Sequence, residues 1–200
     1  MSCVAAGNCA AGGIYTDSSE NGQVFVVSEK NGTWGKAVPV PGLPTLNAGD
    51  IADVQSISCA SPGNCAVGGT YKTAAFLFQG YVVSEKNGTW GNAIEIPNLG
   101  TLNKGGNVDT VNVGCVSAGN CVAAGDYLTA PGEDSATNAF VASENKGAWA
   151  KATQLPGLST LNHGSSIINA ISCTLSGRCA ADGTYEVRPG ARQGFVVDQK

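Results

Sequence analysis

The chain has 200 residues, of which 42% are apolar and 13% charged, with 28 glycines and a formal net charge of −4. This composition is typical of a β-rich domain with many turns, and the acidic balance argues against a nucleic-acid partner, because such proteins usually present a basic face. No apolar run is long enough to cross a membrane, and the opening letters MSCVAAGNC lack the basic and apolar regions of a signal peptide. We therefore expect no nucleic acid and no membrane as a partner.

The first predicted element is a hairpin closed by a cysteine pair, and the same C-x5-C pair occurs four times. The pairs are Cys3 and Cys9, Cys59 and Cys65, Cys115 and Cys121, and Cys173 and Cys179. Cysteines that face each other across two antiparallel strands lie within disulfide range. A structural zinc would favour closer cysteine spacing and four converging ligands, and the single histidine, His163, lies outside the pairs. The pattern predicts four disulfides, no metal, no cofactor, and a secreted protein from an oxidising compartment.

The cysteine pairs mark a repeat. The first three pairs are 56 residues apart and the fourth follows after 58, which gives units at 2–57, 58–113, 114–171 and 172–200, the last one incomplete. The stretch VVSEKNGTWG appears at 26–35 and again at 82–91.

Each unit is predicted to contain four short strands. In the second unit they are 54–59, 65–71, 80–85 and 89–97, with an Asn87-Gly88 turn before the last one. A four-stranded repeat of this length is typical of a propeller blade. We therefore predict an all-β β-propeller built from four-stranded blades, with three to four blades in the chain; a solenoid of stacked sheets is the alternative.

The two end units each hold three predicted strands, so neither end completes the other. Three outcomes stay open at this point: a small ring closed by one chain, a ring shared by two or more chains, or part of a longer propeller, natural or engineered. An open sheet edge invites pairing with another chain, so we expect a homo-oligomer.

Aromatic residues recur at fixed places in the units and are expected in the core between blades. They are Tyr15, Tyr71, Tyr127 and Tyr185 after the cysteine pairs, and Trp34, Trp90 and Trp149 at the start of the fourth strand.

Residues that depart from the repeat are the candidate binding positions. The second unit has Phe76-Leu77-Phe78 where the first is polar, which indicates either a contact surface or an extension of the strand. The third unit has an acidic insertion with Glu133 and Asp134. The fourth unit holds all three arginines, Arg178, Arg188 and Arg192. These cations indicate either a solvated face or a site for an anionic glycan or an acidic partner.

The segments SEKNGTW (28–34 and 84–90) and SENKGAW (143–149) resemble the Asp-box hairpin of sialidase-type propellers. Lys30, Lys86 and Asn145 stand where that motif has its Asp, and the Trp comes one residue early. The whole repeat resembles secreted bacterial propellers with a cysteine pair in each blade. A sialidase would place an arginine triad from different blades beside a Tyr/Glu nucleophile pair, whereas these three arginines share one unit.

The chain has no GxSxG, no HExxH and no glycine-rich phosphate loop. We predict a non-enzymatic repeat scaffold that binds a glycan or a protein surface. The alternatives are a structural, self-assembling repeat protein and a sialidase-like glycosidase.

Overall fold

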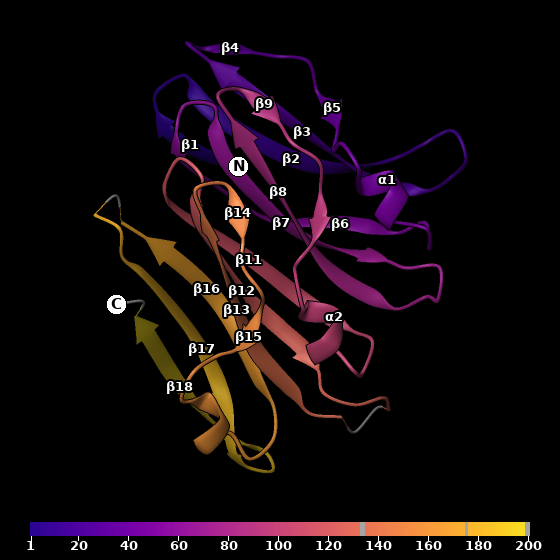
Figure 1. Cartoon of the computed structure of the whole chain (residues 1–200), viewed down its shortest axis with the longest axis vertical. Helices are drawn as coiled ribbons and strands as arrows, with labels where there is room; N and C mark the ends of the chain where they lie inside the picture. The colour runs from indigo at the N-terminus through magenta and orange to yellow at the C-terminus, as the bar shows by residue number, and fades with distance from the viewer. Residues whose placement is uncertain (133–134, 175, 199–200) are drawn as a thin grey trace.

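The computed structural model describes residues 1–132, 135–174 and 176–198. These residues form four antiparallel sheets that follow one another in chain order, from the indigo N-terminal sheet to the yellow C-terminal sheet in Figure 1. The all-β prediction is confirmed. Within the described residues no sheet closes on itself, so the structure is a stack of open sheets and the closed ring of a propeller is not observed.

The first three sheets share one plan, and the fourth is shorter. The first contains β1 (Ser2–Ala5), β2 (Asn8–Thr16), β3 (Gly22–Lys30), β4 (Thr33–Trp34) and β5 (Val38–Pro39). The second contains β6 (Ala52–Ser61), β7 (Asn64–Lys72), β8 (Phe78–Lys86), β9 (Thr89–Trp90) and β10 (Ile94–Glu95). The third contains β11 (Val108–Ser117), β12 (Asn120–Leu128), β13 (Thr137–Asn145), β14 (Ala148–Trp149) and β15 (Thr153–Gln154). The fourth contains β16 (Ser166–Cys173), β17 (Cys179–Arg188) and β18 (Ala191–Asp198).

All four predicted disulfides form between the first two strands of a sheet. In the second sheet Cys59 lies directly opposite Cys65, with their Cα atoms 3.9 Å apart. The other three pairs are Cys3–Cys9, Cys115–Cys121 and Cys173–Cys179. Four disulfides indicate an oxidising environment.

The predicted fourth strand is not continuous. Thr89 and Trp90 pair with the end of β8, whereas Ile94 and Glu95 pair with its middle. Between the two pieces, the N–H of Ala93 donates to the carbonyl of Pro41, in the linker after the first sheet, at 2.7 Å. The strand breaks because its backbone there bonds to a neighbouring sheet, a contact that the local sequence does not reveal.

The linkers between sheets contain one-turn helices that the strand-only prediction missed. They are α1 (Leu43–Leu46), α2 (Leu99–Leu102) and the 3-10 turn η1 (Leu158–Thr160). Each follows a residue with positive φ, and each buries its first leucine. Within the described residues no helix is long enough to span a membrane.

Alternation along the strands places one set of side chains toward the preceding sheet and the other toward the next. In β8, Tyr81 and Val83 pack with Val24 and Val26 of the first sheet, whereas Val82 packs with the third sheet. Three such apolar clusters fill the three junctions.

The aromatic prediction holds for the two central sheets. Tyr71 and Tyr127 are buried, whereas Tyr15 and Tyr185, in the end sheets, are half-buried. Trp90 and Trp149 are half-buried against the clusters, but Trp34, which belongs to the first of the four described sheets, is 44% exposed.

The sequence units and the sheets are offset from each other. The unit boundaries at 57/58, 113/114 and 171/172 fall inside β6, β11 and β16, because the sheets begin a few residues earlier than the cysteine-based units.

Candidate binding clefts between the sheets

A serine, a glutamate and a tryptophan meet at each of the first two junctions. Ser28 of β3 donates to Glu85 of β8 at 2.6 Å and accepts the indole N–H of Trp90 at 3.3 Å. At the next junction, Ser84 donates to Glu144 at 2.7 Å and accepts from Trp149 at 3.2 Å. Because the serine comes from one sheet and the other two residues from the next, this Ser–Glu–Trp triad links consecutive sheets.

The two glutamates are unusual in their burial. Glu85 is 3% exposed and Glu144 is 4% exposed. Within the described residues, the second carboxyl oxygen of each, Oε2, is buried without a protein hydrogen-bond partner. Burial raises the pKa of both carboxyls, and the hydrogen bonds from Ser28 and Ser84 offset only part of that effect. A buried acid of this kind can accept a hydrogen bond and, when protonated, donate one.

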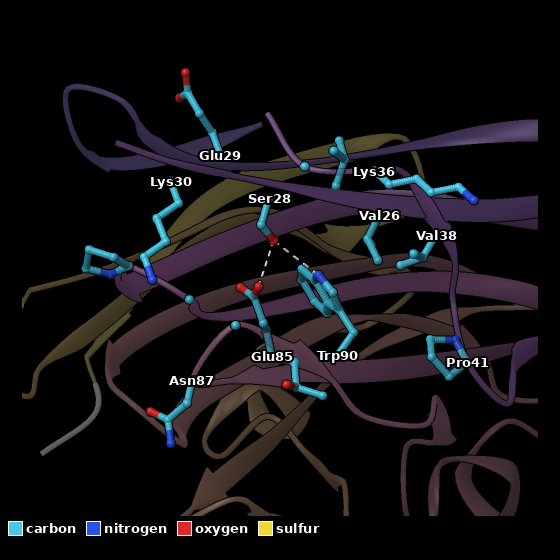
Figure 2. Close-up of a pocket in the computed structure, with 16 residues that line it drawn as sticks. Val26, Ser28, Glu29, Lys30, Lys36, Val38, Pro41, Glu85, Asn87 and Trp90 are labelled. Carbon is cyan, nitrogen blue, oxygen red and sulfur yellow. Dashed lines mark hydrogen bonds between the residues drawn. The ribbon is translucent and has the colours of Figure 1, made fainter. Parts of the chain in front are cut away.

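The first cleft lies over the triad between the first and second sheets and has a volume of about 700 Å³. Figure 2 shows Ser28, Glu85 and Trp90 meeting within it, while Glu29 points away. Exposed Lys30 and Lys36 also line it.

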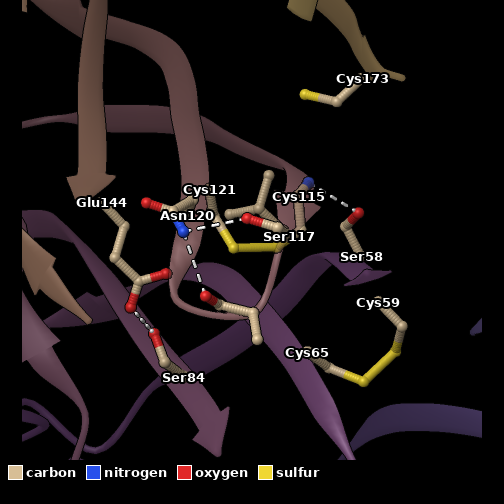
Figure 3. Close-up of a disulfide and its surroundings, with 12 residues drawn as sticks. Ser58, Cys59, Cys65, Ser84, Cys115, Ser117, Asn120, Cys121, Glu144 and Cys173 are labelled. Carbon is tan, nitrogen blue, oxygen red and sulfur yellow. Dashed lines mark hydrogen bonds between the residues drawn. A yellow bond between two sulfur atoms is a disulfide. The ribbon is translucent and has the colours of Figure 1, made fainter. Parts of the chain in front are cut away.

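The second cleft repeats the first between the second and third sheets, with a volume of about 520 Å³. Glu144 and Trp149 contribute to its lining, together with the exposed Lys86 and Lys146. Glu85 lines both clefts, so the two are adjacent. Figure 3 shows the Ser84–Glu144 contact near the Cys115–Cys121 disulfide.

In the first three sheets the cysteine hairpin turn contacts the turn that follows the third strand, and these turns line one end of the first two clefts. In the second sheet, the N–H of Gly88 donates to the carbonyl of Gly63 at 2.8 Å, and that of Asn87 donates to the side chain of Asn64 at 3.2 Å. A Cβ at Gly63, where φ is +71°, would lie 2.7 Å from the Gly88 nitrogen. The cysteine hairpin therefore fits against the Asn-Gly turn only because position 63 is glycine.

The cleft at the third junction is smaller and more apolar than the other two. It has a volume of about 240 Å³ and is lined mainly by apolar side chains, among them Val141, Leu155, Ile171 and Val197. The position equivalent to Glu85 and Glu144 is residue 199, which lies outside the described residues.

The structure does not bring the three arginines together. Arg178 precedes β17 and Arg188 ends it, so the two lie at opposite ends of that strand. Arg192 lies near Arg188, across the β17–β18 hairpin, and pairs with Glu186 at 3.7 Å. All three are exposed.

The Phe76-Leu77-Phe78 segment runs from an exposed loop tip into a strand, and its role as a contact surface stays a prediction. Phe76 lies at the loop tip with φ of +60° and is 70% exposed, whereas Phe78 begins β8. The ammonium of Lys72 lies over both rings, 5.1 Å and 5.6 Å from their centroids. The remaining candidates, Glu133 and Asp134, lie outside the described residues.

Sequence reasoning missed the cleft glutamates. The available signal was a Glu at the same place in three units, Glu29, Glu85 and Glu144, with a serine directly before it in each unit. It also missed Asp126, a departure from the repeat that is 1% exposed and bonded to Thr110. Within the described residues no group of three or more potential metal ligands occurs.

Comparison with known proteins relates the protein to others by fold alone. No protein-family model and no curated protein sequence matches it. One similar solved structure is that of a complex between BT0996 and RGII; the TM-score is 0.50 and the identity 9%, over 98% of the present protein and 68% of the one compared.

Proposed function

We propose that the chain is an arc of a secreted β-propeller and acts as a non-enzymatic glycan-binding module. The observation that carries the proposal is the repeated cleft, in which a tryptophan and a buried carboxyl group are presented side by side between consecutive sheets. Ligand sites combine an apolar wall with a few placed polar groups, and both clefts have this composition.

The chemistry of the triad suits a sugar. A sugar ring has apolar C–H faces that pack on an indole and hydroxyl groups that both donate and accept hydrogen bonds. The unpartnered Oε2 atoms of Glu85 and Glu144 are costly where they are. A ligand hydroxyl that reaches such an atom, after a small adjustment of the side chain, would relieve that cost.

The charges beside the second cleft favour an acidic glycan. In the second cleft the lining cations, Lys86 and Lys146, are exposed, whereas the lining carboxyls, Glu85 and Glu144, are buried and have raised pKa values. Because the lysine ammonium groups are the charges that reach the surface of this cleft, an anionic ligand meets them before it meets the buried carboxyls, although the whole chain carries a net charge of −4.

The similar solved structure agrees with this class of ligand, because its name connects that protein with RGII, a polysaccharide. At 9% identity the agreement concerns fold and not individual residues.

A sialidase-like activity has less support. Its arginine triad would have to converge, and Arg178 lies at the far end of β17 from Arg188. Each triad also ties its carboxyl to a serine of the neighbouring sheet, which suits a fixed binding floor.

The test compares two charge-reversed double variants in calorimetric titrations. The probes are an oligomer of a uronic acid and the neutral oligomer of the corresponding hexose. We expect Lys86→Glu with Lys146→Glu to weaken binding of the acidic oligomer at the second cleft at least about tenfold, which corresponds to 1.4 kcal/mol. Binding at the first cleft, which Lys30 and Lys36 line, should stay as in the wild type, so the titration should lose one of two sites. The control, Lys104→Glu with Lys151→Glu, makes the same charge change at exposed positions that line neither cleft and should bind as the wild type does. Equal weakening by both variants, or no binding of either oligomer by the wild type, would contradict the proposal.

A further inference from the structure

The outward face of the first sheet is an apolar surface that lacks the cover its counterparts have. Phe25 of β3 is half-buried, whereas Tyr81 and Phe140, at the same place in the next two sheets, are fully buried. Trp34 is 44% exposed, whereas its counterparts Trp90 and Trp149 pack against a preceding sheet. We call this surface, formed by Tyr15, Phe25, Val27, Glu29 and Trp34, the head face.

The outward face of the fourth sheet is also uncovered, and it is the opposite kind of face, the one that the other sheets turn toward the next sheet. Val196 of β18 is 73% exposed, whereas Val26 and Val82, at the same place in the first two sheets, are fully buried. Asp198 is exposed and occupies the position that Ser28 and Ser84 hold in the triads. We call this surface, formed by Ala180, Asp182, Val196 and Asp198, the tail face.

The junctions within the chain show how two such faces fit together. At the first junction, Tyr81 and Val83 of the second sheet pack on Val24 and Val26 of the first. The indole of Trp90 donates to Ser28 at the same junction. By position, Phe25 and Val27 of a head face correspond to Tyr81 and Val83, and Val196 of a tail face corresponds to Val26.

We infer that the chain associates head to tail with a second copy of itself, the head face of one copy packing on the tail face of the other. The composite junction places the Trp34 indole N–H against Asp198 of the second copy, which is a better acceptor than the serine of the internal triads. It also completes a cleft with Glu29 and Trp34 on one side, and neither copy forms this cleft alone. Each copy keeps one free face after pairing, so the contact is heterologous and leads to a ring or to a longer stack.

The carboxylates of the composite junction are unfavourable, because Asp182 and Asp198 lie on the tail face and Glu29 lies on the head face. Glu29 would meet Asp198 of the second copy where Glu85 meets Ser28 inside the chain, and two facing carboxylates repel each other. The Asp198→Ser variant restores the internal triad, so it should associate at least several-fold more tightly than the wild type.

The experiment measures mass in solution by light scattering over a wide range of protein concentrations. The wild type should rise from the monomer mass of 20.1 kDa to twice that mass or more. Trp34→Glu blocks the head face and Val196→Glu blocks the tail face, and both positions are exposed, so the variants should fold. Each variant alone should stay monomeric. An equimolar mixture should form a dimer, because the intact head face of Val196→Glu can pack on the intact tail face of Trp34→Glu. The dimer should not grow further, because its two remaining faces are the blocked ones.

Four results would overturn the inference. They are a wild type that stays monomeric throughout, a single blocked variant that still dimerises, weaker association of Asp198→Ser, and loss of association in Phe76→Glu. The last variant changes an exposed aromatic residue away from both faces and should associate as the wild type does.

Discussion

At the scale of single residues, the sheet junctions combine apolar packing with buried acids. Glu85 and Glu144 lie on strand faces that are otherwise filled by Val83 and Ala142. Each is fixed by a serine hydroxyl that also accepts an indole N–H, so one hydroxyl orients two side chains. A group buried at this cost is expected where a specific arrangement or a ligand requires it.

Asp126 gives a residue-scale prediction for the dependence of stability on pH. Burial raises its pKa to about 6, Asp109 adds to the rise, and hydrogen bonds from Thr110 and from the backbone of Ile168 oppose it. Since the pKa is raised on folding, its stabilising contribution is fully present below the ordinary value of 3.8 and is lost as the pH rises through about 6.

Asp126→Asn, which cannot ionise, should therefore gain about 2 to 3 kcal/mol over the wild type between pH 4 and pH 8. Urea unfolding with the disulfides intact, at several pH values, measures the difference. Asp50→Asn, at an exposed loop position outside both clefts and both end faces, is the control and should show no such trend. A constant offset between wild type and Asp126→Asn across this range would contradict the assignment.

At the scale of elements, the contact between the two turns of the second sheet gives a prediction about glycine. Gly63 and Gly88 both have positive φ, so alanine is strained at either position. Only at Gly63 would the new Cβ also meet backbone, 2.7 Å from the Gly88 nitrogen, whereas nothing lies within 4 Å of a Cβ at Gly88.

We expect Gly88→Ala to lower the free energy of unfolding by about 1 to 2 kcal/mol and Gly63→Ala to lower it by about 2 to 4 kcal/mol. Urea unfolding followed by tryptophan fluorescence compares the two variants. Equal losses would mean that backbone strain alone decides the glycine requirement and that the turns do not hold each other.

The strands and turns also show which features could be predicted from the sequence. The cysteine hairpins and the turn at Asn87-Gly88 were predictable because their interactions are local, within a few residues of the chain. The break before Ile94 was not, because it depends on the hydrogen bond from Ala93 to Pro41 of the previous linker. The candidate site was missed for a related reason: Glu85 is a surface residue or a buried one according to whether another sheet covers its face.

At the scale of the whole molecule, each sheet buries its apolar side chains against the neighbouring sheets. The central sheets bury their aromatic residues, and the end sheets leave Trp34 and Val196 exposed. The repeat thus predicts the stacking of sheets, but the way the stack ends depends on surfaces that no local pattern describes. The glycan binding and the head-to-tail assembly that we propose would be separate consequences of the same kind of junction, one using its outer cleft and the other an uncovered face.

The three tryptophans allow one measurement to test the central claim that the clefts are the binding sites. The indole N–H signals of Trp34, Trp90 and Trp149 can be resolved by two-dimensional NMR of the ¹⁵N-labelled protein and assigned with single Trp→Phe variants. Adding an acidic oligosaccharide at low protein concentration should move the Trp90 and Trp149 signals and leave that of Trp34 in place, because only the first two line the described clefts. Raising the protein concentration without ligand should instead move the Trp34 signal. Unchanged Trp90 and Trp149 signals in the presence of a bound glycan would contradict the account.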